Sequence, residues 1–184
     1  MGRERDARGG SIGVWDRCVR LSHWTIAIAV LVTYYTHGGL LYAHRVAGYT
    51  IVALVIARLV WGCIGSPYAR FSDFVAAPHR VARYLAALVR GRDLRFIGHN
   101  PAGGAMILVL WSLLLALGGT GWMLDSPQYR DYRPLLEAHA ILSDVLLVLI
   151  AVHIVGVLLA SWRHRENLIL AMLTGRKRGP RAGD

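Results

Sequence analysis

The sequence predicts an all-α integral membrane protein, a four-helix bundle with both termini in the cytoplasm. Three observations predict this class. First, 55% of the 184 residues are hydrophobic, and they concentrate in four long runs. Second, each run is long enough to cross a hydrocarbon layer of ~30 Å as a helix. Third, the formal net charge is +10, and the basic residues fall mostly in alternate loops, as a membrane topology requires.

The chain is expected to form one membrane domain, residues 1–184. The runs are rich in Leu and Ala and lack two-residue alternation, which favours helices over strands. The first run is not expected to be a signal peptide, since no small-residue cleavage site follows it. In order, the expected parts are a basic N-terminus at 1–20, spans at 21–38, 43–65, 101–124 and 135–162, and a basic tail at 163–184.

The basic residues predict the orientation of these spans. Seventeen lie before the first span, between the second and third, or after the fourth; the other two loops hold only Arg45, Arg130 and Arg133. Cytoplasmic loops carry such an excess, so both termini should be cytoplasmic. This topology, with contact to membrane lipid, accounts for the charge better than nucleic-acid binding does.

The loop between the second and third spans contains one more predicted element. Pro78–Arg90 can form a helix with a proline in its first turn. Its apolar residues Val81, Leu85 and Leu88 share one side, and its arginines lie elsewhere. We therefore expect an interfacial helix on the cytoplasmic surface of the membrane.

Four of the eight histidines are the main functional candidates. His23, His44, His139 and His153 lie within or at the rim of the apolar runs. An imidazole in hydrocarbon is costly unless it has a partner, so each points to a functional site. From the direction of each span, His44 and His139 should lie near the outer face, and His23 near the inner face.

The spacing on the fourth span sets the depth of His153. It follows His139 by fourteen residues, which is roughly 21 Å along a helix and about 40° short of four full turns. The two side chains therefore share one helix face, one level with His44 and the other with His23. Two imidazole pairs from different helices, stacked through the membrane, fit the axial ligands of two b-type haems.

Other interpretations of the histidines stay open. A buried histidine is often a hydrogen-bonded structural residue, and zinc is a weaker alternative because the pairs are too far apart to form one four-ligand site. His37 also follows His23 by fourteen residues and could replace His44 as an outer ligand, although Gly38 and Gly39 suggest that it lies in a turn. Neither Cys18 nor Cys63 belongs to a C-x-x-C-H run, so covalent c-type haem is not expected.

Two arginines are candidates for binding haem propionates. Arg58 follows His44 by fourteen residues and so shares its face at the level of the inner haem. Its guanidinium could pair with a propionate, or the side chain could extend to the inner headgroups. Arg20 could bind a propionate at the inner rim. Gly48 lies one turn from His44, where a small residue would let a porphyrin edge approach the backbone.

Five ordered stretches resemble a known family, the prokaryotic b-type cytochromes that include bacterial cytochrome b561 and the cytochrome b subunit of nickel–iron hydrogenase. They are VWDRCVRLSHW (Val14–Trp24), HRVAGYTIVALVIARLVWG (His44–Gly62), GHNPAGG (Gly98–Gly104), AHAILSDVLLVLIAVHIVGVLLAS (Ala138–Ser161) and HRENLILAMLTGRKR (His164–Arg178). The resemblance implies a multi-pass protein of the bacterial inner membrane that holds two haems b. It implies the axial ligands His23, His44, His139 and His153, and so favours His44 over His37.

The resemblance also implies a function in respiratory electron transport. Family members pass electrons between the quinone pool and a redox partner, such as a hydrogenase or a c-type cytochrome. We expect a quinone or quinol near the inner rim, where Arg20, Arg58 and the loop of His99 lie. Two alternatives remain: an oxidoreductase that couples superoxide or another small molecule to quinone, and a haem-free transporter of metal or protons.

Overall fold

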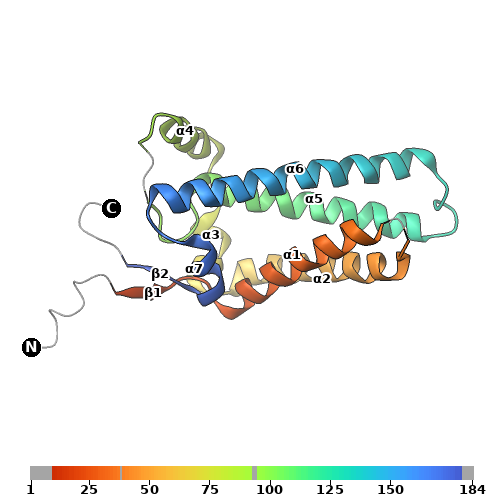
Figure 1. Ribbon diagram of the computed structural model, residues 1–184, viewed down its shortest axis with the longest axis horizontal. Coiled ribbons are helices and arrows are strands. Elements are labelled where there is room, and N and C mark those ends of the chain that lie inside the picture. The colour runs from red at the N-terminus through yellow and green to blue at the C-terminus, as the bar shows by residue number, and fades with distance from the viewer. Residues whose placement is uncertain (1–9, 38, 93–94, 180–184) are drawn as a thin grey trace, which may run out of the picture. The chain divides into compact units, whose positions relative to one another are not determined.

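The computed structural model describes residues 10–37, 39–92 and 95–179. Gly38, at the end of the first expected span, and the terminal arginines Arg3, Arg5, Arg8 and Arg181 lie outside the described residues. The elements, drawn in Figure 1, are β1 (Ser11–Gly13), α1 (Arg17–Thr36), α2 (Leu41–Ile64), the 3-10 turn η1 (Pro67–Ala69), α3 (Phe71–Phe74), α4 (Pro78–Val89), α5 (Pro101–Asp125), α6 (Arg133–Arg163), α7 (Leu168–Thr174) and β2 (Arg176–Arg178).

The four apolar runs form the four long helices α1, α2, α5 and α6. Each is long and apolar enough to cross a membrane, with lengths of 20, 24, 25 and 31 residues. Helix α1 begins four residues before the expected span because Asp16 caps it, its Oδ1 accepting a hydrogen bond from the Val19 N–H at 2.8 Å. Helix α5 begins at Pro101, where the Asn100 side chain accepts from the Gly103 N–H at 2.7 Å.

The contacts of the chain form two compact units. The core unit comprises Leu21–Trp61 and Ile107–Val152, and the strand unit comprises Met1–Arg20, Gly62–Met106 and His153–Asp184. Each long helix contributes to both units, so a single helix carries residues of each.

The core unit is built around Val55, which is completely buried. Small residues bring its helices close together: a Cβ on Gly118 of α5 would lie 2.2 Å from Cγ2 of Val52 on α2. Outward-facing apolar side chains such as Ile141 and Val148 are more than 60% exposed, as on helices that contact lipid. The buried residues packed with Val55 are Ala29, Val30, Ala47, Ile51, Leu113, Leu114 and Leu146.

The strand unit contains a two-stranded antiparallel ribbon that the all-α prediction did not include. Strand β1 pairs with β2 so that Ile12 lies opposite Lys177 (Figure 1). Helix α7 leads into β2 through Gly175, whose φ of 81° is the left-handed conformation that ends many helices. A Cβ at Gly175 would lie 2.6 Å from the Trp15 carbonyl oxygen, so this turn packs directly against the residues that follow β1.

The helix predicted between the second and third spans is present as α4, Pro78–Val89, with Pro78 in its first turn. Tyr84 is its buried residue, and Leu85 is 46% exposed. Its C-terminal end is tied to α6, because Arg163 Nη1 donates a hydrogen bond to the Leu88 carbonyl at 2.9 Å. Its position on the membrane surface stays a prediction.

Candidate functional site

The core unit brings together two of the four candidate histidines. His44 lies in the first turn of α2, and His139 lies in the second turn of α6. Their ring centroids are 6.3 Å apart, and the ring planes are inclined by 61°. Both side chains are half-buried.

Hydrogen bonds set the tautomer of His44 and are compatible with the same tautomer in His139. His44 Nδ1 lies 2.9 Å from the Thr33 carbonyl oxygen, which can only accept, so this nitrogen carries the proton. His139 Nδ1 lies 2.7 Å from Thr120 Oγ1. The Thr120 hydroxyl can donate to the carbonyls of Ala116 and Leu117, which lets its Oγ1 accept from His139 Nδ1. With this tautomer in both rings, Nε2 is the atom with a free lone pair.

This arrangement fits two axial ligands of one metal ion. Two imidazoles that bind a metal between them place their ring centres about 6 Å apart, since each side contributes ~2 Å of metal–nitrogen bond and ~1 Å from that nitrogen to the ring centre. Metal-bound histidines usually donate their other N–H to a carbonyl or hydroxyl oxygen, as both rings do here. Within the described ranges, no three His, Cys, Asp or Glu residues gather as a metal-binding group, so a two-histidine haem iron fits better than a structural zinc site.

Glycines leave room around this pair. A Cβ on Gly121 of α5 would lie 3.4 Å from Cε1 of His139, so the ring is seated closely against a helix backbone. Gly48, one turn from His44 on α2, faces open space, with nothing within 4 Å of the position its Cβ would take. A flat macrocycle can approach a helix backbone at such a residue.

A charged cluster in the core unit joins the beginning of α2 to the end of α5. Asp125 accepts a hydrogen bond from the Tyr49 hydroxyl at 2.9 Å and forms an ion pair with Arg45, also at 2.9 Å. Arg45 follows His44 directly in the sequence. Sequence reasoning counted Arg45 only as an outer-loop charge and did not single out Asp125 or Tyr49.

The other two candidate ligands belong to different units. His23, on α1 in the core unit, meets Trp24 edge-on with ring centroids 5.2 Å apart. His153 lies fourteen residues after His139 on α6, at the start of the third segment of the strand unit. Their pairing stays a prediction.

His37 lies in the turn after α1, as its neighbouring glycines suggest. It is exposed, and its Nδ1 is hydrogen-bonded to the carbonyl oxygen of Tyr34. The structure thus ties His37 to its own turn, and places His44 beside His139.

The two candidate propionate ligands have defined surroundings. Arg58 is 6% exposed, and its guanidinium carbon lies 5.5 Å from the centroid of the Trp111 ring, at cation–π distance. Arg20 hydrogen-bonds to the Leu173 carbonyl at the end of α7, so it joins α1 to the C-terminal part of the strand unit. Whether either side chain binds a propionate stays a prediction.

His99 lies in an aromatic cluster of the strand unit. Its ring centroid is 4.5 Å from that of Trp15 and 5.4 Å from that of Phe74. Beside it, a Cβ on Gly98 would lie 2.8 Å from Oδ2 of Asp73. Burial raises the pKa of the Asp73 carboxyl above its usual value.

Sequence reasoning missed a buried ionic cluster formed by Arg95, Glu166 and Lys177. Arg95 Nη2 lies 3.1 Å from both carboxylate oxygens of Glu166, and the Arg178 N–H donates to Oε1 at 2.7 Å. Lys177 Nζ donates to the carbonyls of Phe96 and Ile97 at 3.0 and 2.9 Å. The three charged side chains are only 5–7% exposed. Residues so far apart in the sequence give no local signal for such a cluster.

The pKa values in this cluster follow from burial and from the paired charges. Burial by itself would raise the pKa of Glu166, but hydrogen bonds from Arg95 and Arg178 and the charge of Lys177 outweigh it, so the pKa is lowered. Burial also lowers the pKa of Lys177, and the neighbouring Glu166 only partly opposes this effect.

The chain is similar to known b-type cytochrome subunits. Curated relatives include the probable Ni/Fe-hydrogenase B-type cytochrome subunits of Azotobacter vinelandii and Bradyrhizobium diazoefficiens, each 22% identical over 95% of this chain and covering 91% and 89% of their own lengths. That of Rhizobium leguminosarum bv. viciae is 23% identical over 91% of this chain and 89% of its own length. No solved structure matches the chain.

The profile of the family described as prokaryotic cytochrome b561 matches residues 14–175, nearly the whole chain. Together with the four membrane-length helices, this match identifies a b-type cytochrome with several spans in the bacterial inner membrane, and so a protein of electron transport. Haem b is the cofactor that this family implies. The chain therefore belongs to the prokaryotic cytochrome b561 family.

Proposed function

We propose that the protein is a di-haem cytochrome that transfers electrons across the membrane between the quinone pool and a redox partner. His44 and His139 would hold an outer haem b, and His23 and His153 an inner one. The observation that carries the proposal is the His44–His139 pair, whose ring separation and hydrogen-bonded Nδ1 atoms suit ligation through Nε2.

The residues of the outer site have separate tasks. When bound, each haem would supply a one-electron iron couple. The Thr33 carbonyl and the Thr120 hydroxyl hold the imidazole planes and raise the basicity of Nε2 by accepting the Nδ1 protons. Gly121 gives the His139 ring its seat against α5. At the inner haem, by contrast, the proposed partners of propionates are Arg58, which is buried beside Trp111, and Arg20.

The whole chain would act as one membrane cytochrome domain with both termini in the cytoplasm. This orientation rests on the alternating distribution of basic residues. It would place α4 on the cytoplasmic surface of the membrane, with its apolar side toward the lipid. His44 and His139 would then lie on the outer side and His23 and His153 on the inner side.

The inner rim would bind the quinone. His99 can donate a hydrogen bond to a quinone oxygen or accept one from a quinol hydroxyl, and the rings of Trp15 and Phe74 pack beside it. The raised pKa of Asp73 gives a nearby group that can exchange the protons that quinone reduction takes up. A hydrogenase is the proposed partner protein, since the curated relatives are named as subunits of Ni/Fe-hydrogenases.

Haem content and visible spectra of the purified protein test the proposal. We expect about two haems per chain and split b-type α-bands in reduced-minus-oxidised spectra. His139→Ala and His153→Ala should each lose one haem and keep the other, while His37→Ala, the matched control, should keep both. A colourless protein after expression with ample haem would refute the redox function. Loss of one haem in His37→Ala, with both retained in His44→Ala, would refute the outer pair.

A further inference from the structure

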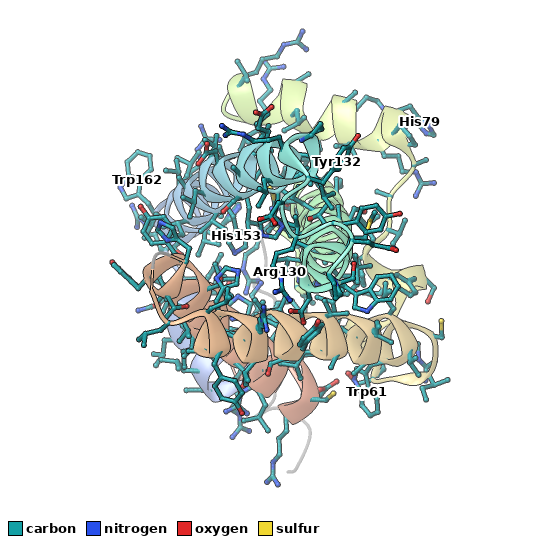
Figure 2. The ribbon with its side chains drawn as sticks, turned by 90° about the vertical axis from the view of Figure 1, so that its right-hand side faces the viewer. Trp61, His79, Arg130, Tyr132, His153 and Trp162 are labelled. Carbon is teal, nitrogen blue, oxygen red and sulfur yellow. The ribbon has the colours of Figure 1, made fainter. Side chains whose placement is uncertain are left out.

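A groove in the strand unit lies where α6 turns into α7. It is a shallow, open groove with a volume of about 460 Å³, within the range of small-molecule sites. Leu158, Trp162 and Ile169 form its apolar walls, and Arg165 lies at its polar end. Trp162 is 78% exposed and projects away from α6, as Figure 2 shows. An apolar wall with a tryptophan and a cation beside it is typical of the membrane–water interface.

The other polar groups of the groove have partners within the protein. Ser161 Oγ accepts from the Leu168 N–H at 3.3 Å, and Asn167 Oδ1 accepts from the Leu170 N–H at 2.8 Å. The Glu166 carboxylate is held by Arg95 and by the backbone of Arg178. The exposed guanidinium of Arg165 therefore gives the groove its positive charge.

The backbone of Arg165 is strained. Its φ is 48°, and among the described residues it is the only one other than glycine that has a positive φ. The hydrogen bonds from the Arg165 N–H to the Trp162 carbonyl and from the Glu166 N–H to the Ser161 carbonyl form the helix-ending motif whose left-handed position is usually glycine. This chain thus has arginine where glycine would fit better, and such strain is concentrated at functional positions.

We propose that this groove binds an anionic phospholipid of the surrounding membrane. Arg165 pairs with the phosphate, Trp162 lies at the level of the headgroup, and Leu158 and Ile169 contact the first part of the acyl chain. The proposal requires a net negative lipid because one unpaired guanidinium sets the charge of the site. It is independent of the haem and quinone assignments, since it needs only that the protein is in a membrane.

Arg165→Gly separates binding from folding, because it removes the charge and relieves the strain together. The full-length haem protein is purified in detergent and mixed with phosphatidylglycerol or phosphatidylcholine, and bound lipid is counted by native mass spectrometry. We expect affinity for phosphatidylglycerol to fall about five-fold, the value of one basic residue near a membrane surface. The melting temperature should instead rise by ~2–4 °C.

Two further arms make the result decisive. Arg165→Gln should lose the same affinity without the rise in melting temperature, whereas Arg176→Gln, which removes an exposed arginine outside the groove, should keep it. Unchanged phosphatidylglycerol binding in both Arg165 variants, or an equal loss in Arg176→Gln, would overturn the proposal. If phosphatidylcholine binds as well as phosphatidylglycerol, or if millimolar inorganic phosphate displaces the lipid, the groove is not selective for an anionic lipid and the assignment is wrong.

Discussion

The core unit and the strand unit both bury polar side chains, but they use them differently. In the core unit, His44 and His139 each commit one ring nitrogen to the protein, and both Nε2 atoms are left for a ligand. In the strand unit, Glu166 is bound by Arg95, Lys177 and the Arg178 backbone, and these contacts hold distant segments together. The polar groups of the first unit are thus available to the proposed haem, whereas those of the second unit are used up in contacts within the protein.

Removing the charge of Glu166 should have the largest effect on stability. Glu166→Gln leaves Arg95 and Lys177 buried without their counter-ion, which costs about 3–5 kcal/mol. Hydrogen exchange should become faster in β1 and β2, while the spectrum of the haem protein stays unchanged. Glu137→Gln, at an exposed carboxylate of α6, is the matched control and should leave exchange as it is. Equal protection in both variants would mean that the cluster does not hold the strand unit.

Helix packing in the core unit is tested by two adjacent glycines. Gly118→Ala should destabilise the protein by about 1–3 kcal/mol, because the new Cβ would lie 2.2 Å from Val52 Cγ2. Gly119→Ala meets nothing within 4 Å and should stabilise α5 by up to about 1 kcal/mol through helix propensity. Thermal unfolding in detergent measures both. Similar melting temperatures for the two variants would contradict the close approach of α2 and α5.

The hydrogen bond to His139 is the next contact to test. Thr120→Val removes the acceptor of the Nδ1 proton and should weaken retention of one haem by about 10–100-fold. Thr50→Val is the control, since Thr50 also bonds its own helix, at the Val46 carbonyl. Transfer of haem to apomyoglobin gives the rates. If Thr120→Val releases haem no faster than Thr50→Val, then Thr120 does not support a ligand.

The smallest effect we expect is the pH dependence of the strand unit. The folded pKa of Glu166 is below its ordinary value of 4.5, so the stability it contributes is complete above about pH 4.5 and is lost as the pH falls through the lower folded value. The pH dependence that Lys177 contributes has the opposite sign to that of a lysine whose pKa is raised by folding. Its folded pKa is below 10.5, so stability rises as the pH increases from that folded value toward 10.5. Hydrogen exchange of β1 and β2, corrected for intrinsic rates, would measure how stability changes with pH in both ranges. In Glu166→Gln, stability should no longer change with pH in the acidic range.

The sequence predicts the four long helices well because each is a continuous apolar run. It also predicts that His44 and His139 lie at one level, since depth and helix face follow from residue spacing. It does not reveal Thr33 and Thr120 as partners of the two rings, because neither contact follows from a periodic pattern.

The strand unit was harder to predict. The sequence pattern predicts that Arg95 and Lys177 are loop charges that set the topology, but in the structure both are buried with Glu166. Composition assigns a charged residue to the surface, and only the folded chain brings these side chains to one carboxylate. The ribbon of β1 and β2 is also difficult to predict from sequence, because strands of three residues are too short to show an alternating pattern.

The contacts of the ribbon also determine the order in which parts of the chain can fold during biosynthesis. The backbone carbonyls of Phe96 and Ile97 are held by Lys177, and Ile12 lies opposite it across the ribbon. Lys177 leaves the ribosome only after all four spans have been translated. The β1 segment and the loop that holds Phe96 and Ile97 must therefore wait for Lys177 before their native contacts with it can form. This part of the protein can therefore reach its native contacts only after the fourth span has been translated.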